Sequence, residues 1–282
     1  VALSRNSKGH NPIFPTTGSE FTVSGKFTPP YSLFDGVNYK TLADQEEYKV
    51  VTKQNTTTTN GQYVPAGTYL DANGNPVANN DYRLAAVDQG KLDQRRFKML
   101  EYYKLKFKGD WYSSITKIGN QPLVLRTLGE FGFMGAYNND RGLVPFERFY
   151  VGGDGMANFT MDGREIVQLR GYDNYALTPI NDKGEQIGGT IYNKFTLELR
   201  YPITLKQSAS IYALAFAEAG AAYTNFKDYT PFNLKRSTGL GLRVFMPMFG
   251  LLGIDFAYGY DNAPGTTQPS GWQTHFIIGQ QF

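Results

Sequence analysis

Apolar and charged residues alternate without a break between Tyr103 and Trp111. The odd positions carry tyrosine, leucine, phenylalanine, glycine and tryptophan, and every even position carries a lysine or an aspartate. A β-strand turns successive side chains to opposite faces. This period of two therefore predicts a strand with one apolar face and one wet face.

The same period recurs along the chain, and it predicts eight strands and no convincing amphipathic helix. One of them is apolar on both faces and is interrupted only by Glu218. The eight segments lie at about 21–27, 103–111, 123–133, 195–201, 211–223, 239–246, 252–260 and 272–282.

The connections between these strands alternate in length, which favours an outer-membrane β-barrel. Such barrels have short turns at one end and long loops at the other, with aromatic residues near the strand ends. A soluble β-sandwich, the competing interpretation, has no reason to sort its loops in this way. The short turns lie at 113–121, 202–210 and 247–250, and the long loops at about 28–100, 138–193, 225–236 and 261–271.

Composition and charge argue against several other classes of protein. The 282 residues contain no cysteine, so neither a disulfide framework nor a thiolate metal site is possible. The net charge is +3, with lysine and arginine spread along the chain, which gives no support to nucleic-acid binding. Mean hydropathy is −0.40, and the longest apolar run, 211–217, is far too short for a transmembrane helix. The first residues, 1–5, look like an internal start without a secretory signal.

The long loop at about 28–100 and the two histidines carry only weak signals. The loop at about 28–100 is rich in asparagine, threonine and glycine, and we expect an exposed excursion too polar to supply a core. Its residues 71–75 begin like a calcium loop, but Pro76 and Tyr82 occupy two essential positions. The histidines, His10 and His275, are too few for a zinc or catalytic set, and no nucleophile–base pair is visible. We therefore expect no enzyme activity, cofactor or metal.

Four motifs in order resemble the BamA family of outer-membrane assembly proteins. Residues 145–153 (PFERFYVGG), followed by Leu169, Arg170, Gly171 and Tyr172, are similar to the family's sixth extracellular loop. Leucine stands where the family has valine, and an insertion at 154–166 separates the halves of the motif. The other matches are FPTTG at 14–18, LELRYP at 197–202 and FAEAG at 216–220, the last with glutamate for aspartate.

This resemblance implies an all-β transmembrane antiparallel barrel of sixteen strands, preceded by periplasmic POTRA domains. The whole chain, 1–282, would then be the C-terminal half of the barrel, with the tail of one more strand at 1–5. It implies an insertase in the bacterial outer membrane, with long loops outside, acting on nascent outer-membrane proteins beside accessory lipoproteins or surface proteins. A polypeptide-secretion transporter of the same superfamily is the alternative, and a plain porin would not need the Arg-Gly-Tyr loop.

Arg170 is the residue for which the motif has a physical explanation. A loop that folds back into a barrel lumen needs an anchor, and a guanidinium group offers five donors in a planar fork. Carboxylates on inward strand positions can accept these bonds, and by parity Glu218 and Glu198 both point inward. In the family, the acid equivalent to Glu218 is the usual partner. Gly171 would let the backbone approach the wall, and Tyr172 could pack there and donate a hydrogen bond.

The C-terminal strand, 272–282, is the second informative segment. Trp272, Phe276, Ile278 and the terminal Phe282 share its apolar face, which resembles the terminal β-signal of outer-membrane proteins. In the family this strand meets the first strand in a weak lateral seam, where an opened edge offers N–H and C=O groups to a client strand. Gly279 stands where it could loosen the pairing.

Overall fold

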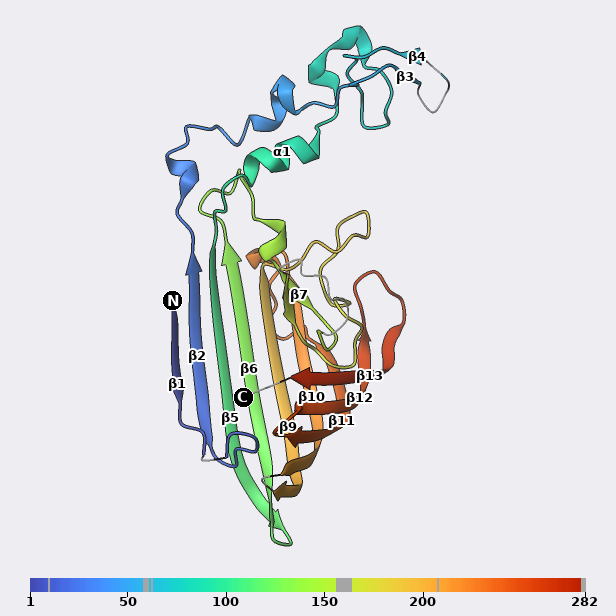
Figure 1. Cartoon of the computed structure of the whole chain (residues 1–282). Helices are drawn as coiled ribbons and strands as arrows, with labels where there is room; N and C mark the ends of the chain where they lie inside the picture. The colour runs from blue at the N-terminus through green and yellow to red at the C-terminus, as the bar shows by residue number, and fades with distance from the viewer. Residues whose placement is uncertain (10, 58–60, 62, 156–163, 207, 280–282) are drawn as a thin grey trace. The chain divides into compact units, whose positions relative to one another are not determined.

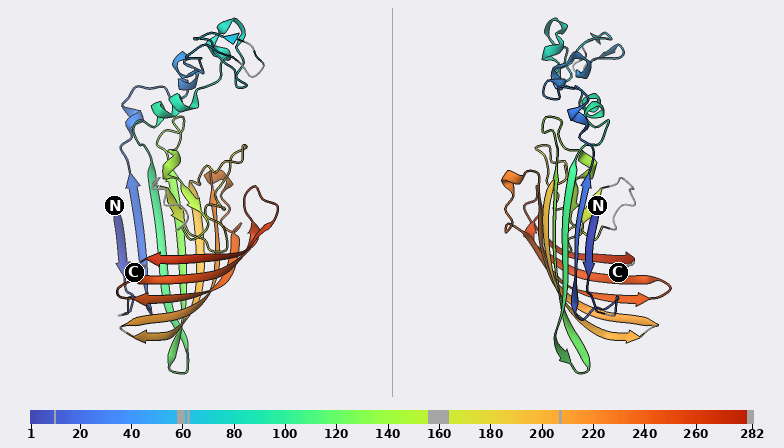
Figure 2. Two further views of the ribbon diagram at one scale, coloured as in Figure 1. Left: turned by 45° about the vertical axis from the view of Figure 1, so that its right-hand side comes forward. Right: turned by 90° about the vertical axis from the view of Figure 1, so that its left-hand side faces the viewer.

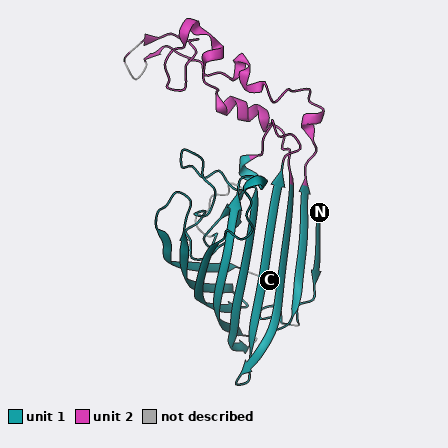
Figure 3. Cartoon of the chain, turned by 180° about the vertical axis from the view of Figure 1, so that it is seen from behind, with its two compact units in different colours: residues 1–26, 104–135, 145–282 teal, residues 27–103, 136–144 magenta. Residues whose placement is uncertain are grey.

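The chain forms two compact units in the computed structural model, which describes residues 1–9, 11–57, 61, 63–155, 164–206 and 208–279. We call the first the sheet unit; it comprises Val1–Lys26, Lys104–Gly135 and Pro145–Phe282. The second, which we call the loop unit, comprises Phe27–Tyr103 and Ala136–Val144 (Figure 3). No helix among the described residues is long and apolar enough to cross a membrane.

A nine-stranded antiparallel sheet makes up most of the sheet unit, and every strand lies beside its predecessor in the sheet order β1-β2-β5-β6-β9-β10-β11-β12-β13. The sheet curls, so that β11, β12 and β13 run across β2 and β5 rather than along them (Figures 1 and 2). The strands are Ala2–Asn6, Gly18–Phe27, Tyr103–Ile118, Gln121–Gly135, Ile191–Lys206, Ala209–Tyr223, Lys235–Met246, Gly250–Asn262 and Pro269–Gly279.

All eight predicted strands are present, and β1 is the ninth, where the sequence suggested the tail of one more. The faces also follow the predicted period. On β9, Phe195 and Leu197 are 50% and 49% exposed, whereas Glu198, which lies between Leu197 and Leu199, is 3% exposed. An apolar outer face around a buried charged interior is the inverse of a water-soluble protein, and it suits a barrel whose outside meets lipid.

The loop unit corrects two expectations. It contains an α-helix, α1 (Gln89–Arg96), and its buried Tyr39, Leu42, Tyr48 and Leu92 pack into a small core. Eight residues are too few to show a helical period in a polar sequence, and these core residues come from separate turns. The remaining elements of the unit are the hairpin β3 (Thr56–Thr57) and β4 (Tyr63–Val64), and 3₁₀ turns at Tyr31–Leu33, Leu42–Asp44, Glu46–Tyr48, Ala78–Asn80 and Tyr82–Leu84.

One long segment of the sheet unit lies outside the main sheet. Residues 145–190, which we call the inner loop, form the second part of the connection between β6 and β9 and contain a 3₁₀ turn (Pro145–Glu147) and two short strands. These strands, β7 (Phe149–Val151) and β8 (Glu165–Val167), pair in parallel. A further 3₁₀ turn, Phe226–Asp228, lies between β10 and β11.

Candidate functional site

The inner loop carries Arg170 to the inner face of the sheet. Beyond the β7–β8 ladder, Gly153 and Leu169 exchange two backbone hydrogen bonds of 3.0 Å, which keep the two halves of the loop together. Leu169 is fully buried, and its side chain fills the space beside Gly220 on β10, where a Cβ would lie 2.5 Å from the leucine Cδ1. The backbone geometry thus fixes the position from which the next side chain extends.

The Arg170 guanidinium bridges three acids on three strands. One nitrogen, Nη2, lies 2.8 Å from both Glu198 Oε1 and Glu218 Oε1, and Nη1 lies 3.2 Å from Asp255 Oδ2. The backbone N–H of Arg170 donates a further bond of 2.8 Å to Glu218 Oε2. The guanidinium also stacks on Phe216, with its central carbon 3.5 Å from the ring centroid. These contacts join β9, β10 and β12 through one loop residue.

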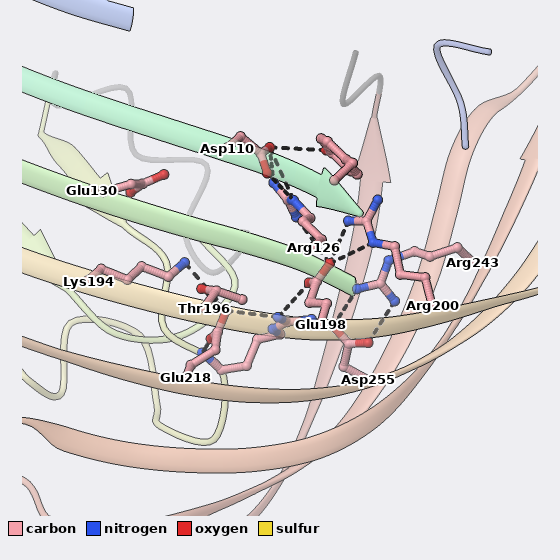
Figure 4. A network of polar contacts seen from close by, with 12 residues as sticks. Asp110, Arg126, Glu130, Lys194, Thr196, Glu198, Arg200, Glu218, Arg243 and Asp255 are labelled. Carbon is pink, nitrogen blue, oxygen red and sulfur yellow. Dashed lines mark hydrogen bonds and ion pairs between the residues drawn. The ribbon is translucent and has the colours of Figure 1, made fainter. Parts of the chain in front are cut away.

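Every acid that Arg170 contacts has another basic partner on the sheet, as Figure 4 shows for the surrounding network. The N···O distances run from 2.5 to 3.5 Å. Because the wall cations remain, loss of Arg170 alone would not leave a buried carboxylate without a basic partner. The partners are Arg126 and Arg200 for Glu198, Lys194 for Glu218, and Arg243 for Asp255.

Gly171 brings the loop backbone into direct contact with the wall. Its φ is +87°, and a Cβ there would lie 2.7 Å from Ser237 Cβ. On the facing strand, a Cβ on Gly259 would lie 2.2 Å from the Gly171 carbonyl oxygen. The Gly171 N–H donates to His275 Nε2 at 2.8 Å. Two facing glycines are therefore needed for this approach, because any side chain would hold the loop away.

Tyr172 completes the motif and contacts β11 and β12. Its ring is fully buried, and its hydroxyl donates to the Arg236 carbonyl oxygen at 2.7 Å. The hydroxyl also accepts the Asp261 N–H at 3.4 Å. Burial raises the pKa of Tyr172 to about 12.

A second clamp of opposite polarity holds the loop to another part of the sheet. Glu165 on β8 lies 2.6 Å from Lys104 Nζ and 2.8 Å from Lys106 Nζ, both on β5. Burial alone would raise the pKa of Glu165, but the hydrogen bonds from both lysines outweigh it and lower the pKa. Glu147 pairs with Lys26 on β2 at 2.7 Å. The loop thus offers a cation to acids on β9, β10 and β12 and carboxylates to lysines on β2 and β5.

The structure brings together Arg170 with the two acids that strand parity indicated, Glu218 and Glu198. Sequence reasoning missed Asp255 and His275 as partners of the motif. Parity did place both residues on the inner face, because they alternate with the apolar outward positions of their strands. Nothing local in either strand could connect them to a loop about 85 or 104 residues away.

The terminal strand presents its predicted apolar face outward. Trp272, Phe276 and Ile278 are 74%, 54% and 67% exposed, and Trp272 packs edge-on against Tyr258 at a centroid distance of 5.4 Å. Gly279, at the end of β13, has a φ of +144°. The predicted terminal residue, Phe282, lies outside the described residues.

The interior beside Arg170 is a partly open polar cavity of about 440 Å³, lined by charged side chains of several strands. The described residues contain no group of three or more side chains placed to hold a metal ion. The ion pairs and hydrogen bonds described above position the inner loop on the sheet.

Comparison with known proteins agrees with this architecture. Residues 85–282 match the model of the Omp85 superfamily domain. The fold is similar to the crystal structure of BamA from Haemophilus ducreyi lacking POTRA domains 1–3, with a TM-score of 0.53 and 17% sequence identity. The similarity covers 98% of this chain and 41% of that one, so this chain spans about two fifths of that structure. No curated protein matches the chain.

Proposed function

Because the chain belongs to the Omp85 superfamily of outer-membrane β-barrels, we propose that it is the C-terminal barrel half of an insertase, which folds β-barrel proteins into the bacterial outer membrane. Insertion or transport of proteins at that membrane is the function at superfamily level. The narrower role, assembly of nascent barrel proteins through a lateral seam, is our proposal.

The observation that supports it best is the docking of the inner loop on the last strands of the sheet. The Arg-Gly-Tyr motif contacts β9, β10, β12 and, through His275, the terminal strand β13. A loop fixed in the interior narrows an open pore. A protein that must hold one sheet edge in a defined state does gain, because the loop stabilises one arrangement of the strands beside that edge.

The chemistry of assembly would reside in the backbone of the edge strand. An edge strand has N–H and C=O groups that no neighbour uses, and an extended client segment can pair with them. No covalent bond is made or broken, and no cofactor is required. We further propose that the loop unit faces the outside and binds accessory lipoproteins or surface proteins, since its small core gives it a defined surface.

The proposal is tested with the full-length protein reconstituted in liposomes. Arg170→Ala should slow the folding of several unrelated, urea-denatured barrel proteins, because the loop loses its fork of donors. The matched control is Arg83→Ala, an arginine whose guanidinium packs beside Tyr82 in the loop unit. Unchanged folding of all clients would contradict the proposal. Normal barrel folding with loss of one secreted polypeptide would favour the secretion transporter instead.

A further inference from the structure

A groove lies on the outward face of the sheet, over β10. Its volume is about 500 Å³, and mostly apolar side chains line it. This volume lies within the range of about 300–1,000 Å³ found for small-molecule pockets. The strands that form the groove are β9, β10, β11 and β12, and each has a neighbouring strand on both sides. The groove is therefore a feature of the middle of the sheet and not of an edge.

Small residues on β10 between larger residues on its neighbours create the groove. Ala217 and Ala219 form its floor. Both point outward, and the strands on either side lie about 4.8 Å away. Two methyl groups between taller side chains leave a channel along the strand. The residues opposite are Phe195 on β9 and Arg236 on β11 for Ala219, and Leu197 on β9 and Thr238 on β11 for Ala217.

The width of the channel selects a thin, extended occupant. The strands that carry its walls lie about 10 Å apart, and their side chains narrow the space between them. A helix with its side chains is about 10–12 Å across, which is too wide. Phe195 and Leu197 are 50% and 49% exposed on the face that meets lipid in such a barrel. A single acyl chain fits both the width and the chemistry of this channel.

One end of the groove is polar, because Arg236, Thr238 and Tyr260 lie there. Arg236 donates from Nε and Nη2 to Asp261 at 3.2 and 3.0 Å, and its side chain is 67% exposed. Its Nη1 donates to none of the residues that the structure describes, so that nitrogen can serve a ligand.

The two hydroxyls beside Arg236 offer one more donor. Thr238 Oγ1 and Tyr260 Oη lie 2.7 Å apart, and either can donate to the other. The pair carries two hydrogens, of which this contact uses one, so the second can bind an acceptor outside the pair. A guanidinium nitrogen and a hydroxyl donor together suit an anion rich in oxygen, and arginine is well matched to phosphate. The polar end of the groove therefore has the chemistry of a phosphate site.

The position of the polar end indicates which side of the membrane supplies the ligand. Arg236 is the second residue of β11, directly after one of the long connections. The proposed function places these long loops outside the cell. The outer leaflet of a bacterial outer membrane consists of a phosphorylated glycolipid with several acyl chains. Its phosphates lie at the membrane surface, with the acyl chains below them.

We propose that this groove binds the phosphorylated glycolipid of the outer leaflet. One acyl chain lies over Ala217 and Ala219, and a phosphate binds Arg236 and the hydroxyl pair of Thr238 and Tyr260. The ligand class, an acyl chain with a phosphate, follows from the groove itself. Only the choice of the outer leaflet rests on the proposed function.

The experiment titrates the lipid-depleted, full-length protein with lipid A and counts bound lipid by native mass spectrometry. Ala217→Leu fills the channel, and Arg236→Gln removes the cation. We expect each to weaken binding at least about tenfold, equivalent to about 1.4 kcal/mol, as for one lost hydrogen bond to a charged group. Arg236→Lys keeps the charge and should retain most of the binding.

Two matched controls should bind lipid A as the wild type does. Thr274→Leu adds a leucine at an exposed outward position of β13, and Lys117→Gln removes an exposed cation at the opposite end of β5. Heat-dependent gel mobility shows whether each variant is folded. Wild-type binding by folded Ala217→Leu would overturn the groove as the site.

Other lipids test the remaining parts of the proposal. Equal binding of dephosphorylated lipid A would overturn the phosphate contact, and tighter binding of phosphatidylglycerol would overturn the assignment to the outer leaflet. A second copy of the protein bound in place of lipid, and lost in Ala217→Leu, would overturn the lipid as the occupant. Failure to fold client barrels with lipid A binding intact would contradict the proposed function alone.

Discussion

Exchanging the charges of Arg170 and Glu218 should not restore the protein, because the arginine serves three acids rather than one. The single change Arg170→Glu places a carboxylate beside Glu198, Glu218 and Asp255. At an effective dielectric constant of about 20, a like-charge pair 4 Å apart costs about 4 kcal/mol, before the nearby arginines offset part of it. The single change Glu218→Arg opposes Arg170 and also Lys194, which now lies 3.5 Å from the acid.

The double variant regains one opposite-charge pair between positions 170 and 218. Its carboxylate at 170 still faces Glu198 and Asp255, now 2.8 and 3.2 Å from the arginine. Each of these contacts costs about as much as the regained pair contributes, so we expect no net recovery. Arg170→Lys keeps the charge but loses the fork, and it should fall between wild type and Arg170→Glu.

The assay compares the four variants in the full-length protein by the fraction with the heat-dependent gel mobility of a folded barrel and by the outer-membrane levels of several client barrels. Every 1.4 kcal/mol lowers the ratio of folded to unfolded protein tenfold, so a cost of about 4 kcal/mol lowers that ratio by more than a hundredfold. Both readouts should therefore fall in the single reversals and in the double. Wild-type levels in the double variant would refute the reasoning. They would mean that Arg170 and Glu218 act as an isolated pair.

Three further changes probe the surroundings of the motif. Gly259→Ala should displace the inner loop, because its Cβ would lie 2.2 Å from the Gly171 oxygen. Labelling of a cysteine introduced into the inner loop should then become faster. Gly129→Ala, whose Cβ meets nothing closer than 3.9 Å, should have no effect on the labelling. Glu165→Gln should weaken the attachment of the inner loop by about 1 kcal/mol, as expected for a partly exposed ion pair. Because the pKa of Glu165 is lowered, its pairing with the lysines should be present at neutral pH and lost as acidification protonates the carboxyl. Hydrogen exchange in β8 measures both effects. Arg141→Ala should destabilise the loop unit by about 3 kcal/mol, because it removes the partner of a buried carboxylate; limited proteolysis should then cut that unit while the barrel mobility is unchanged.

The local sequence pattern was sufficient to predict the strands, because the alternation of consecutive residues determines which side chains share a face. Phe195 and Leu197 point outward and Glu198 inward whatever the rest of the chain does. The same reasoning failed in the loop unit. Tyr39, Leu42, Tyr48 and Leu92 form a core from scattered positions, and no period of two or of 3.6 marks them.

The candidate site was only half predictable for a related reason. Arg170 and its acids could be proposed from parity and from the family resemblance, but parity gives a face and not a position along it. The register decides the position: Glu218 lies opposite Thr196, and Asp255 lies opposite Gly241. The room for the Asp255 side chain depends on the facing glycine, because a Cβ on Gly241 would lie 1.9 Å from Asp255 Oδ1.

The sequence by itself determined the fold class, the strands and the sign of each face, since these follow from residues within a few positions of one another. The tertiary structure decided which charges meet. Arg170 reaches acids 28, 48 and 85 residues away, and Asp154 reaches an amide 122 residues away. Such contacts exist only after the sheet has curled around the loop, so curvature and register, which are collective properties of nine strands, determine them.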